Sequence, residues 1–266
     1  MHQVPDTAKG EQAMKAEFGW RGRVGLILPA DNVVMEPELG SLAVPGVSFH
    51  GLRMTSTVHE QMRQQAIDLG GVLDEMGVDV AVYACAETSF NAGAEMRENL
   101  SSLIADNCRV PVVTATNAML EAIAAVGMRR ASVVTPYAPG SGALFESTLR
   151  EHGVDVLSAT HRDFRLEGGD PREWFHTNRQ DSRTVREMAR AVVHPDADGL
   201  IVSATNFPAL GAVQELEAEL GIPVVTSNQS ILWWCLTRLG LDTAELPLHD
   251  LGRLFAEPLS AAGGGR

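Results

Sequence analysis

Cys85 is the residue whose type and position say most about chemistry in this sequence. It ends a short apolar run, Asp79–Cys85, and is followed by Ala86-Glu87-Thr88-Ser89, which has the character of a helix start. A thiol at a helix N-terminus has a lowered pKa, and its thiolate is a good nucleophile. Free cysteine is also a common core residue. The sequence therefore leaves two interpretations of Cys85 open, a reactive thiolate and a packing residue.

Other polar side chains follow the ends of further apolar runs. They are Asp31-Asn32, Tyr137, Thr205-Asn206 and Ser227-Asn228-Gln229. Because parallel strands end at one edge of a sheet, we expect these residues to lie near Cys85. Their hydroxyls and amides, with helix N-terminal N–H groups, suit a small carboxylate. Without a Gly-x-Gly-x-x-Gly spacing or a Cys/His cluster, the sequence predicts no nucleotide or other cofactor and no metal.

The elements that position these residues alternate between short apolar strands and amphipathic helices. The expected strands are Arg23–Pro29, Val47–Met54, Asp79–Cys85, Pro111–Ala115, Ala131–Pro136, Val154–Ala159, Gly199–Ala204 and Pro223–Ser227. The expected helices are Val58–Met76, Ala92–Ile104, Asn117–Val126, Gly142–His152, Arg183–His194 and Pro208–Leu220. Glycines at helix ends, expected as C-caps, are Gly77, Gly127, Gly153, Gly221 and Gly240. This alternation predicts an α/β fold with doubly wound parallel sheets.

The chain also repeats itself. VAVYACAETSF followed by CRVPVVTATN matches GLIVSATNFPAL followed by GIPVVTSNQS, which places Cys85 opposite Ala204 and Thr114 opposite Thr226. A general likeness among βαβ units is one explanation. The other is two Rossmann-like halves with pseudo-two-fold symmetry and the active site in the cleft between them. We expect a first half at 21–117 plus 230–259 and a second at 118–229. A flexible arm at 1–20 and a flexible tail at 260–266 complete the expected organisation.

Composition narrows the class of protein. The chain has 266 residues, 45% of them hydrophobic, and a formal net charge of −13. These values are typical of a soluble globular protein, and the acidic balance argues against nucleic-acid binding. No apolar run is long enough for a membrane span, and the N-terminus lacks a secretory pattern. Three cysteines at unrelated spacings indicate free thiols in the cytoplasm. A homodimer is the default expectation for such an enzyme.

Five segments together resemble a known family. They are RVGLILPADNVVMEPEL, VYACAETSF, SVVTPY, LIVSATNFPAL and IPVVTSNQSILWWCL. They are similar to the aspartate/glutamate racemase superfamily, and most of all to its branch of maleate cis–trans isomerases, arylmalonate decarboxylases and decarboxylase-like proteins of ectoine utilisation. The likeness covers nearly the whole chain after Trp20. It implies that a small carboxylate or dicarboxylate binds between two similar halves without metal or organic cofactor.

The resemblance also implies roles for individual residues. Cys85 falls on the first of two family cysteines, one at a strand end of each half. Asn32 and Tyr137 fall on substrate-binding positions. Ala86, Thr205 and Asn206 are expected to complete the carboxylate site. In the isomerases the first cysteine, as thiolate, adds to the double bond. The new single bond rotates, and elimination releases the trans isomer.

The second cysteine position departs from the family. Where the family reads Ser-Cys-Thr-Asn, this chain reads Ser203-Ala204-Thr205-Asn206. Three explanations compete: a deliberate replacement that traps a ligand, natural one-cysteine chemistry, or an inactive relative that only binds. Racemisation by two bases needs an acid and a base on opposite faces, so Ala204 argues against an amino-acid racemase. Covalent addition needs mainly the nucleophile.

Three functions follow from these residues. The first is an isomerase of a small dicarboxylate, of the maleate type, with Cys85 as nucleophile. The second is a decarboxylase-like enzyme of the ectoine or arylmalonate type. The arylmalonate variety is disfavoured because those enzymes keep their single cysteine at the second position. The third is an inactive carboxylate-binding relative. The stretch Arg165–Thr177 looks unlike the isomerases, and we expect it to alter substrate contacts or to form a lid.

Overall fold

Two parallel sheets with the same strand order form the frame of the molecule. The computed structural model describes residues 17–167 and 175–256. The first sheet has the order β2 (Val47–Met54), β1 (Gly22–Pro29), β3 (Val80–Tyr83), β4 (Val112–Thr114). The second has the order β6 (Asp155–His161), β5 (Arg130–Thr135), β7 (Gly199–Val202), β8 (Val224–Thr226). Every pairing is parallel, which confirms the α/β fold with two similar halves.

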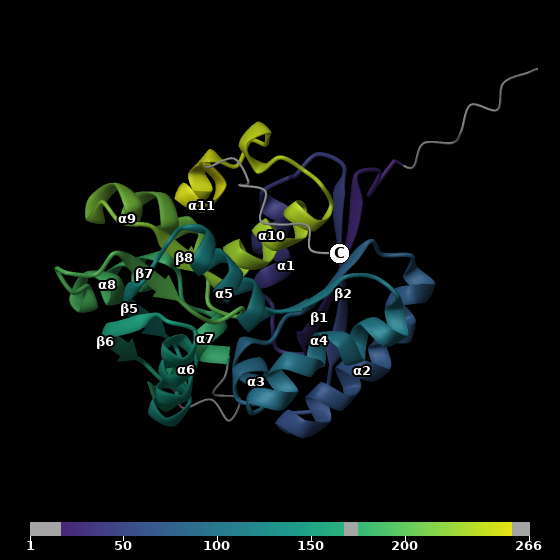
Figure 1. Cartoon of the computed structure of the whole chain (residues 1–266), viewed down its shortest axis with the longest axis horizontal. Helices are drawn as coiled ribbons and strands as arrows, with labels where there is room; N and C mark the ends of the chain where they lie inside the picture. The colour runs from purple at the N-terminus through teal and green to yellow at the C-terminus, as the bar shows by residue number, and fades with distance from the viewer. Residues whose placement is uncertain (1–16, 168–174, 257–266) are drawn as a thin grey trace, which may run out of the picture.

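Helices cover the outer faces of both sheets (Figure 1). Beside the first sheet lie α2 (His59–Met76) and α4 (Ala94–Cys108), which pack on each other. Beside the second lie α6 (Pro139–Glu151), α8 (Ser182–Val192) and α9 (Val213–Leu220). The central strands are therefore buried on both faces, as their continuous apolar sequence predicts. Val24, Leu26 and Leu28 of β1, for example, have no exposed surface.

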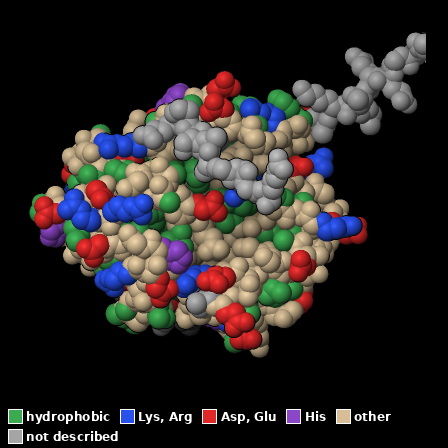
Figure 2. All heavy atoms as spheres, in the orientation of Figure 1, with side chains coloured by type: hydrophobic (Ala, Val, Ile, Leu, Met, Phe, Trp, Pro, Cys, Tyr) green, Lys and Arg blue, Asp and Glu red, His purple; other side chains and the backbone are tan. Residues whose placement is uncertain are grey.

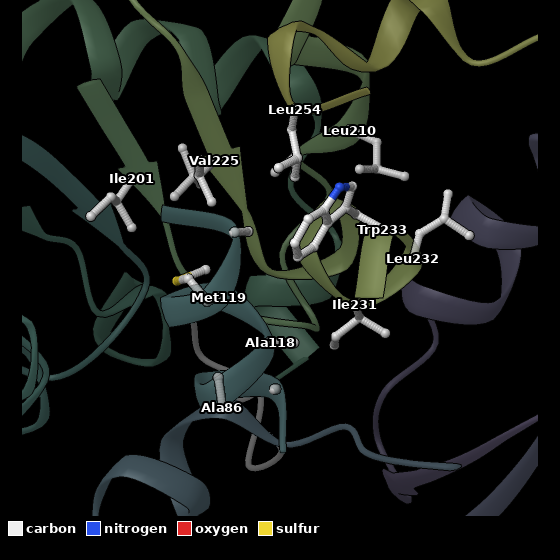
Figure 3. Close-up of a cluster of buried hydrophobic side chains, with 14 of the residues drawn as sticks. Ala86, Ala118, Met119, Ile201, Leu210, Val225, Ile231, Leu232, Trp233 and Leu254 are labelled. Atoms are coloured by element: carbon white, nitrogen blue, oxygen red, sulfur yellow. The ribbon is translucent and has the colours of Figure 1, made fainter. Parts of the chain in front are cut away.

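Two helices join the halves. They are α5 (Ala115–Ala125), which contacts β4 and β8, and α10 (Ser227–Arg238), which contacts β3 and β8 and packs along α5. Figure 3 shows part of the buried cluster they share, with Met119 of α5 and Trp233 of α10 among apolar side chains of the second half. Removing these apolar surfaces from water holds the two sheets in a fixed relation.

The repeat has a structural basis at two threonines. Thr114 caps α5 by accepting a hydrogen bond from the Asn117 N–H (3.2 Å). Its counterpart Thr226 caps α10 and forms a capping box with Gln229. At the other helix ends, the five predicted C-cap glycines all have positive φ, from 61° to 80°. A glycine adopts this left-handed conformation without a Cβ clash.

The third and seventh strands end two residues earlier than the sequence pattern suggested. The last ladder bonds run from the Ala84 N–H to the Ile27 carbonyl (2.8 Å) and from the Ser203 N–H to the Val134 carbonyl (3.0 Å). Beyond these bonds the backbone turns away to begin the next segment. Cys85 and Ala204 therefore lie in turns just past the sheets, at equivalent places in the two halves.

Smaller elements complete the chain. They are α1 (Met35–Ser41), α3 (Ala86–Phe90), α7 (Phe175–Asn178), α11 (Arg253–Ala256) and the 3₁₀ turns η1 (Phe164–Glu167), η2 (Leu210–Ala212), η3 (Thr243–Glu245) and η4 (His249–Leu251). The predicted tail lies outside the described residues, as does most of the predicted arm. Within the part of the chain that the structure describes, no helix is both long and apolar enough to cross a membrane. Acidic and basic side chains are interspersed over the face shown in Figure 2.

Candidate functional site

A cavity of about 470 Å³ lies between the carboxyl ends of the two sheets. The first sheet contributes the residues that follow β1, β2 and β3, and the second contributes those that follow β5, β6 and β7. The described residues that line it are Pro29–Asp31, Thr55–Thr57, His59, Met62, Cys85–Thr88, Pro136–Tyr137, Arg165, Thr177 and Ala204–Asn206. We call it the inter-sheet cavity. The structure thus brings Cys85 and Ala204 to one cavity, together with Ala86, Tyr137, Thr205 and Asn206.

Burial raises the pKa of the Cys85 thiol to about 11. Hydrogen bonds from the Thr88 hydroxyl and backbone N–H act in the opposite direction, while the charges of Glu87 and Asp31 raise the pKa further. Of the two interpretations that the sequence left open, this burial favours a protonated thiol in the cavity. The helix that Cys85 caps, α3, is only five residues long. Its dipole is small beside the free energy lost when a thiolate leaves water.

Thr205 links the two halves beside this thiol. Its hydroxyl donates to the Ala84 carbonyl (3.0 Å) and accepts from the Asn32 side-chain amide (3.1 Å). The Asn32 carbonyl oxygen accepts from the N–H groups of Val34 and Met35, at the start of α1. Asn32 is almost fully buried and is not among the described residues that line the inter-sheet cavity. In this structure its side chain positions Thr205.

A second link runs from Asn206 to Asp31. The Asn206 amide donates to the Asp31 carboxylate (3.2 Å), and its oxygen accepts from the Val33 N–H (3.3 Å). Burial raises the pKa of Asp31. The Asp31 carboxylate of the first half is thus held by Asn206 of the second half, which lies two residues after Ala204 in the sequence.

Tyr137 keeps its proton in the cavity wall. Its hydroxyl lies 3.0 Å from the Ser203 hydroxyl, and burial raises the pKa of Tyr137 well above 10. Its ring packs against Phe90, with centroids 5.4 Å apart. A buried, oriented phenol of this kind is a hydrogen-bond donor for an oxyanion.

Two further charged residues, Glu87 and Arg165, line the inter-sheet cavity. The Glu87 carboxylate accepts a 2.5 Å hydrogen bond from the Ser141 hydroxyl of α6. The Arg165 guanidinium donates from two nitrogens to Asp163, at 2.8 Å each. Phe164 anchors this segment, because it is fully buried and packs against Phe207.

Several lining residues escaped sequence reasoning. His59 and the hydroxyl run Thr55–Thr57 follow the edge strand β2 and were not among the predicted site residues, whereas Arg165 and Thr177 are the two ends of the stretch expected to alter substrate contacts. The strand-end rule would have found Thr55–Thr57. Conversely, Ser227–Gln229 are not among the residues that line the cavity. The Ser227 hydroxyl lies behind the cavity wall, where it accepts a hydrogen bond from the Ala204 N–H (3.0 Å). No three His, Cys, Asp or Glu side chains gather as metal ligands within residues 17–167 and 175–256.

The fold and this site define a class: a two-sheet α/β protein with one cysteine and several hydrogen-bond donors in the cavity between its halves. The family model described as arylmalonate decarboxylase matches residues 24–255, and the chain belongs to that family.

Curated relatives and solved structures agree with this assignment. A maleate isomerase from Geobacillus stearothermophilus is 26% identical over 83% of this chain and 93% of its own length. An arylmalonate decarboxylase from Bordetella bronchiseptica is also 26% identical, over 87% of this chain and 92% of its own. A Nocardia farcinica maleate cis–trans isomerase, a cysteine-to-serine mutant with a covalently bound succinylcysteine intermediate, superposes with a TM-score of 0.77. That structure is 25% identical and covers 88% of this chain and 98% of its own.

Proposed function

We propose that the protein is a cofactor-independent isomerase that converts a small cis-unsaturated dicarboxylate, of the maleate type, into its trans isomer. The observation that carries this proposal is the position of Cys85. This residue lines a cavity between the carboxyl ends of two sheets, and that cavity is rich in hydrogen-bond donors. The covalent succinylcysteine named for the Nocardia relative supports the use of sulfur as a nucleophile.

The reaction conserves every atom and electron. The Cys85 thiol first loses its proton to solvent, and the resulting thiolate forms a carbon–sulfur bond with one alkene carbon while the π electron pair moves toward the neighbouring carboxyl group. The former double bond is now single and rotates. The electron pair then re-forms the double bond, the carbon–sulfur bond breaks, and the thiolate is regenerated.

Each wall has a part in this scheme. Tyr137 and the N–H groups at the start of α3 bind the oxyanion that develops during addition. Thr205 and Asn206 form the opposite wall, and Asn32 fixes Thr205 from behind. Ala204 contributes only a methyl group, so the sulfur of Cys85 acts from one face.

The test is direct. Purified protein is incubated with maleate, and fumarate is followed by proton NMR. We expect turnover by the wild-type protein and none by Cys85→Ser. The absence of fumarate from both the wild-type protein and Ala204→Cys overturns the proposal.

A decarboxylase-like reaction is the second candidate, favoured by the family and by equal identity to the Bordetella decarboxylase. A panel of substituted malonates and N-acetylated diamino acids, assayed for carbon dioxide and acetate, separates the two. If dicarboxylates raise the melting temperature and no substrate turns over, the protein is a binding relative instead.

A further inference from the structure

Acidic groups outnumber basic ones along the described wall of the inter-sheet cavity. The titratable lining residues are Asp31, His59, Cys85, Glu87, Tyr137 and Arg165. Two of these are carboxylic acids, and one is a permanent cation. A dianion bound here would bring two more negative charges beside these two carboxylates, which costs more free energy than binding a monoanion.

Both carboxylates lie within electrostatic reach of the reacting sulfur. The charges of Glu87 and Asp31 each act on the Cys85 thiol, and the charge of Glu87 also acts on the Tyr137 hydroxyl. Both groups are fixed in place, Glu87 by Ser141 and Asp31 by Asn206. A substrate whose alkene carbon touches the sulfur therefore lies in a negative field.

The guanidinium belongs to the other half of the molecule. Arg165 follows β6, and its charge is already shared with Asp163, whose side chain is 8% exposed. An ionised carboxylate that binds to this planar cation therefore shares it with Asp163. Among the described lining residues, no second arginine or lysine stands near Cys85 to match another.

We propose that the cavity prefers, over the dianion of a maleate-type dicarboxylate, a cis-unsaturated acid with a single ionised carboxylate, whose other end is a neutral carbonyl group such as a primary amide. Asp31 and Glu87 are the residues that determine this specificity, and Arg165 binds the ionised end. This inference rests on the proposed isomerase function and names its substrate class.

The chemistry of addition agrees with this selection. When sulfur adds to the alkene, the π electron pair moves onto the conjugated carbonyl oxygen, which a neutral amide accepts more readily than a carboxylate that is already negative. Tyr137 is placed to donate to that oxygen. The amide N–H₂ group donates to Asp31 or Glu87, where a second carboxylate would be repelled. Elimination returns the electron pair and releases the trans amide.

The kinetic test compares maleate with its monoamide, maleamate. Their ratio of kcat/KM cancels the ionisation of Cys85, which affects both substrates equally. We expect maleamate to be favoured at least about tenfold at pH 8.5, since one added charge beside a partly buried carboxylate costs at least this factor. The preference should shrink at lower pH, where maleate gains a proton. A preference for maleate at pH 8.5 overturns the inference and leaves the isomerase function intact.

Variants locate the effect. Glu87→Gln and Asp31→Asn keep the shape of the side chain and remove its charge, so each should shift the ratio toward maleate by about tenfold. The matched control is Glu98→Gln, an exposed position of α4, which should leave the ratio unchanged. An unchanged ratio in both cavity variants also overturns the inference.

Binding decides the question even if no substrate turns over. Succinate and succinamate are the saturated counterparts of the two substrates, and calorimetry with wild-type protein measures their affinities. Tighter binding of succinamate at pH 8.5 supports the inference without any isomerase activity. Tighter binding of succinate, or binding of neither compound, overturns it.

Discussion

The Thr205 hydroxyl donates a 3.0 Å hydrogen bond to the carbonyl of Ala84, the residue immediately before Cys85. Thr205 itself immediately follows Ala204. One bond therefore couples the two equivalent turns of the halves, and it is buried on both sides. The distance between the sulfur and the opposite wall depends on it.

Replacing Thr205 with valine tests this coupling. Valine keeps the volume but leaves the Ala84 carbonyl and the Asn32 amide without a partner. We expect the free energy of unfolding to fall by about 1–3 kcal/mol, the usual loss for an orphaned buried polar group. Urea denaturation measures this loss. Thr205→Ser retains the hydroxyl and is the control; equal stability of the valine variant and the wild type contradicts the assignment.

The raised pKa of Cys85 predicts how the thiol reacts with pH. Because only the thiolate is alkylated and its pKa is about 11, its fraction is small at pH 7. The rate of iodoacetamide modification should rise about tenfold per pH unit between pH 7 and 10. Mass spectrometry follows the reaction, and Cys85→Ser reports any background from Cys108 and Cys235. A rate that levels off near pH 7 rules out a raised pKa.

The variant Ala204→Cys tests whether the cavity wall opposite Cys85 lacks a catalytic group. A thiol there supplies a proton donor on the face opposite Cys85, and general acid catalysis contributes about 10²-fold or more. We expect a rise of about this size in the isomerase rate, measured by NMR. Ala204→Ser, with a far weaker acid, should give little. An unchanged rate in Ala204→Cys shows instead that one-cysteine chemistry is complete in this chain.

Tyr137→Phe removes the donor proposed for the developing oxyanion. The Ser203 hydroxyl loses its 3.0 Å partner, so stability should fall by about 1 kcal/mol. The effect on kcat should be larger than the effect on KM, because the donor acts on charge that forms only in the transition state. Steady-state kinetics separates the two parameters. A change confined to KM assigns Tyr137 to ground-state binding.

The fold was predictable because its signals are local. Continuous apolar runs mark β1 and β3, glycines mark helix ends, and Thr114 and Thr226 occupy equivalent cap positions. The parallel topology predicts Cys85 at the carboxyl edge of one half and Tyr137 and Ala204 at that of the other, and the repeat predicts a cleft between these edges.

What escaped prediction depends on partners that are far away in sequence. Asn32 turns to Thr205, 173 residues along the chain, and no local pattern encodes that bond. The pKa of Cys85 reflects burial by surrounding segments, whereas the sequence shows only a helix start. His59 lines the cavity at the start of α2, beyond the end of β2, and the pairing of β2 with β1 that places it there is a property of strand order.

The placement of α10 has a consequence for biosynthesis. This helix follows the last strand, yet it packs against α1 and β3, at the beginning of the chain. A nascent polypeptide that has not yet been extended through Ser227–Arg238 lacks the helix that packs on α1 and β3. The halves therefore do not mature one after the other, and the first half reaches its final packing only after Ser227–Arg238 has been synthesised.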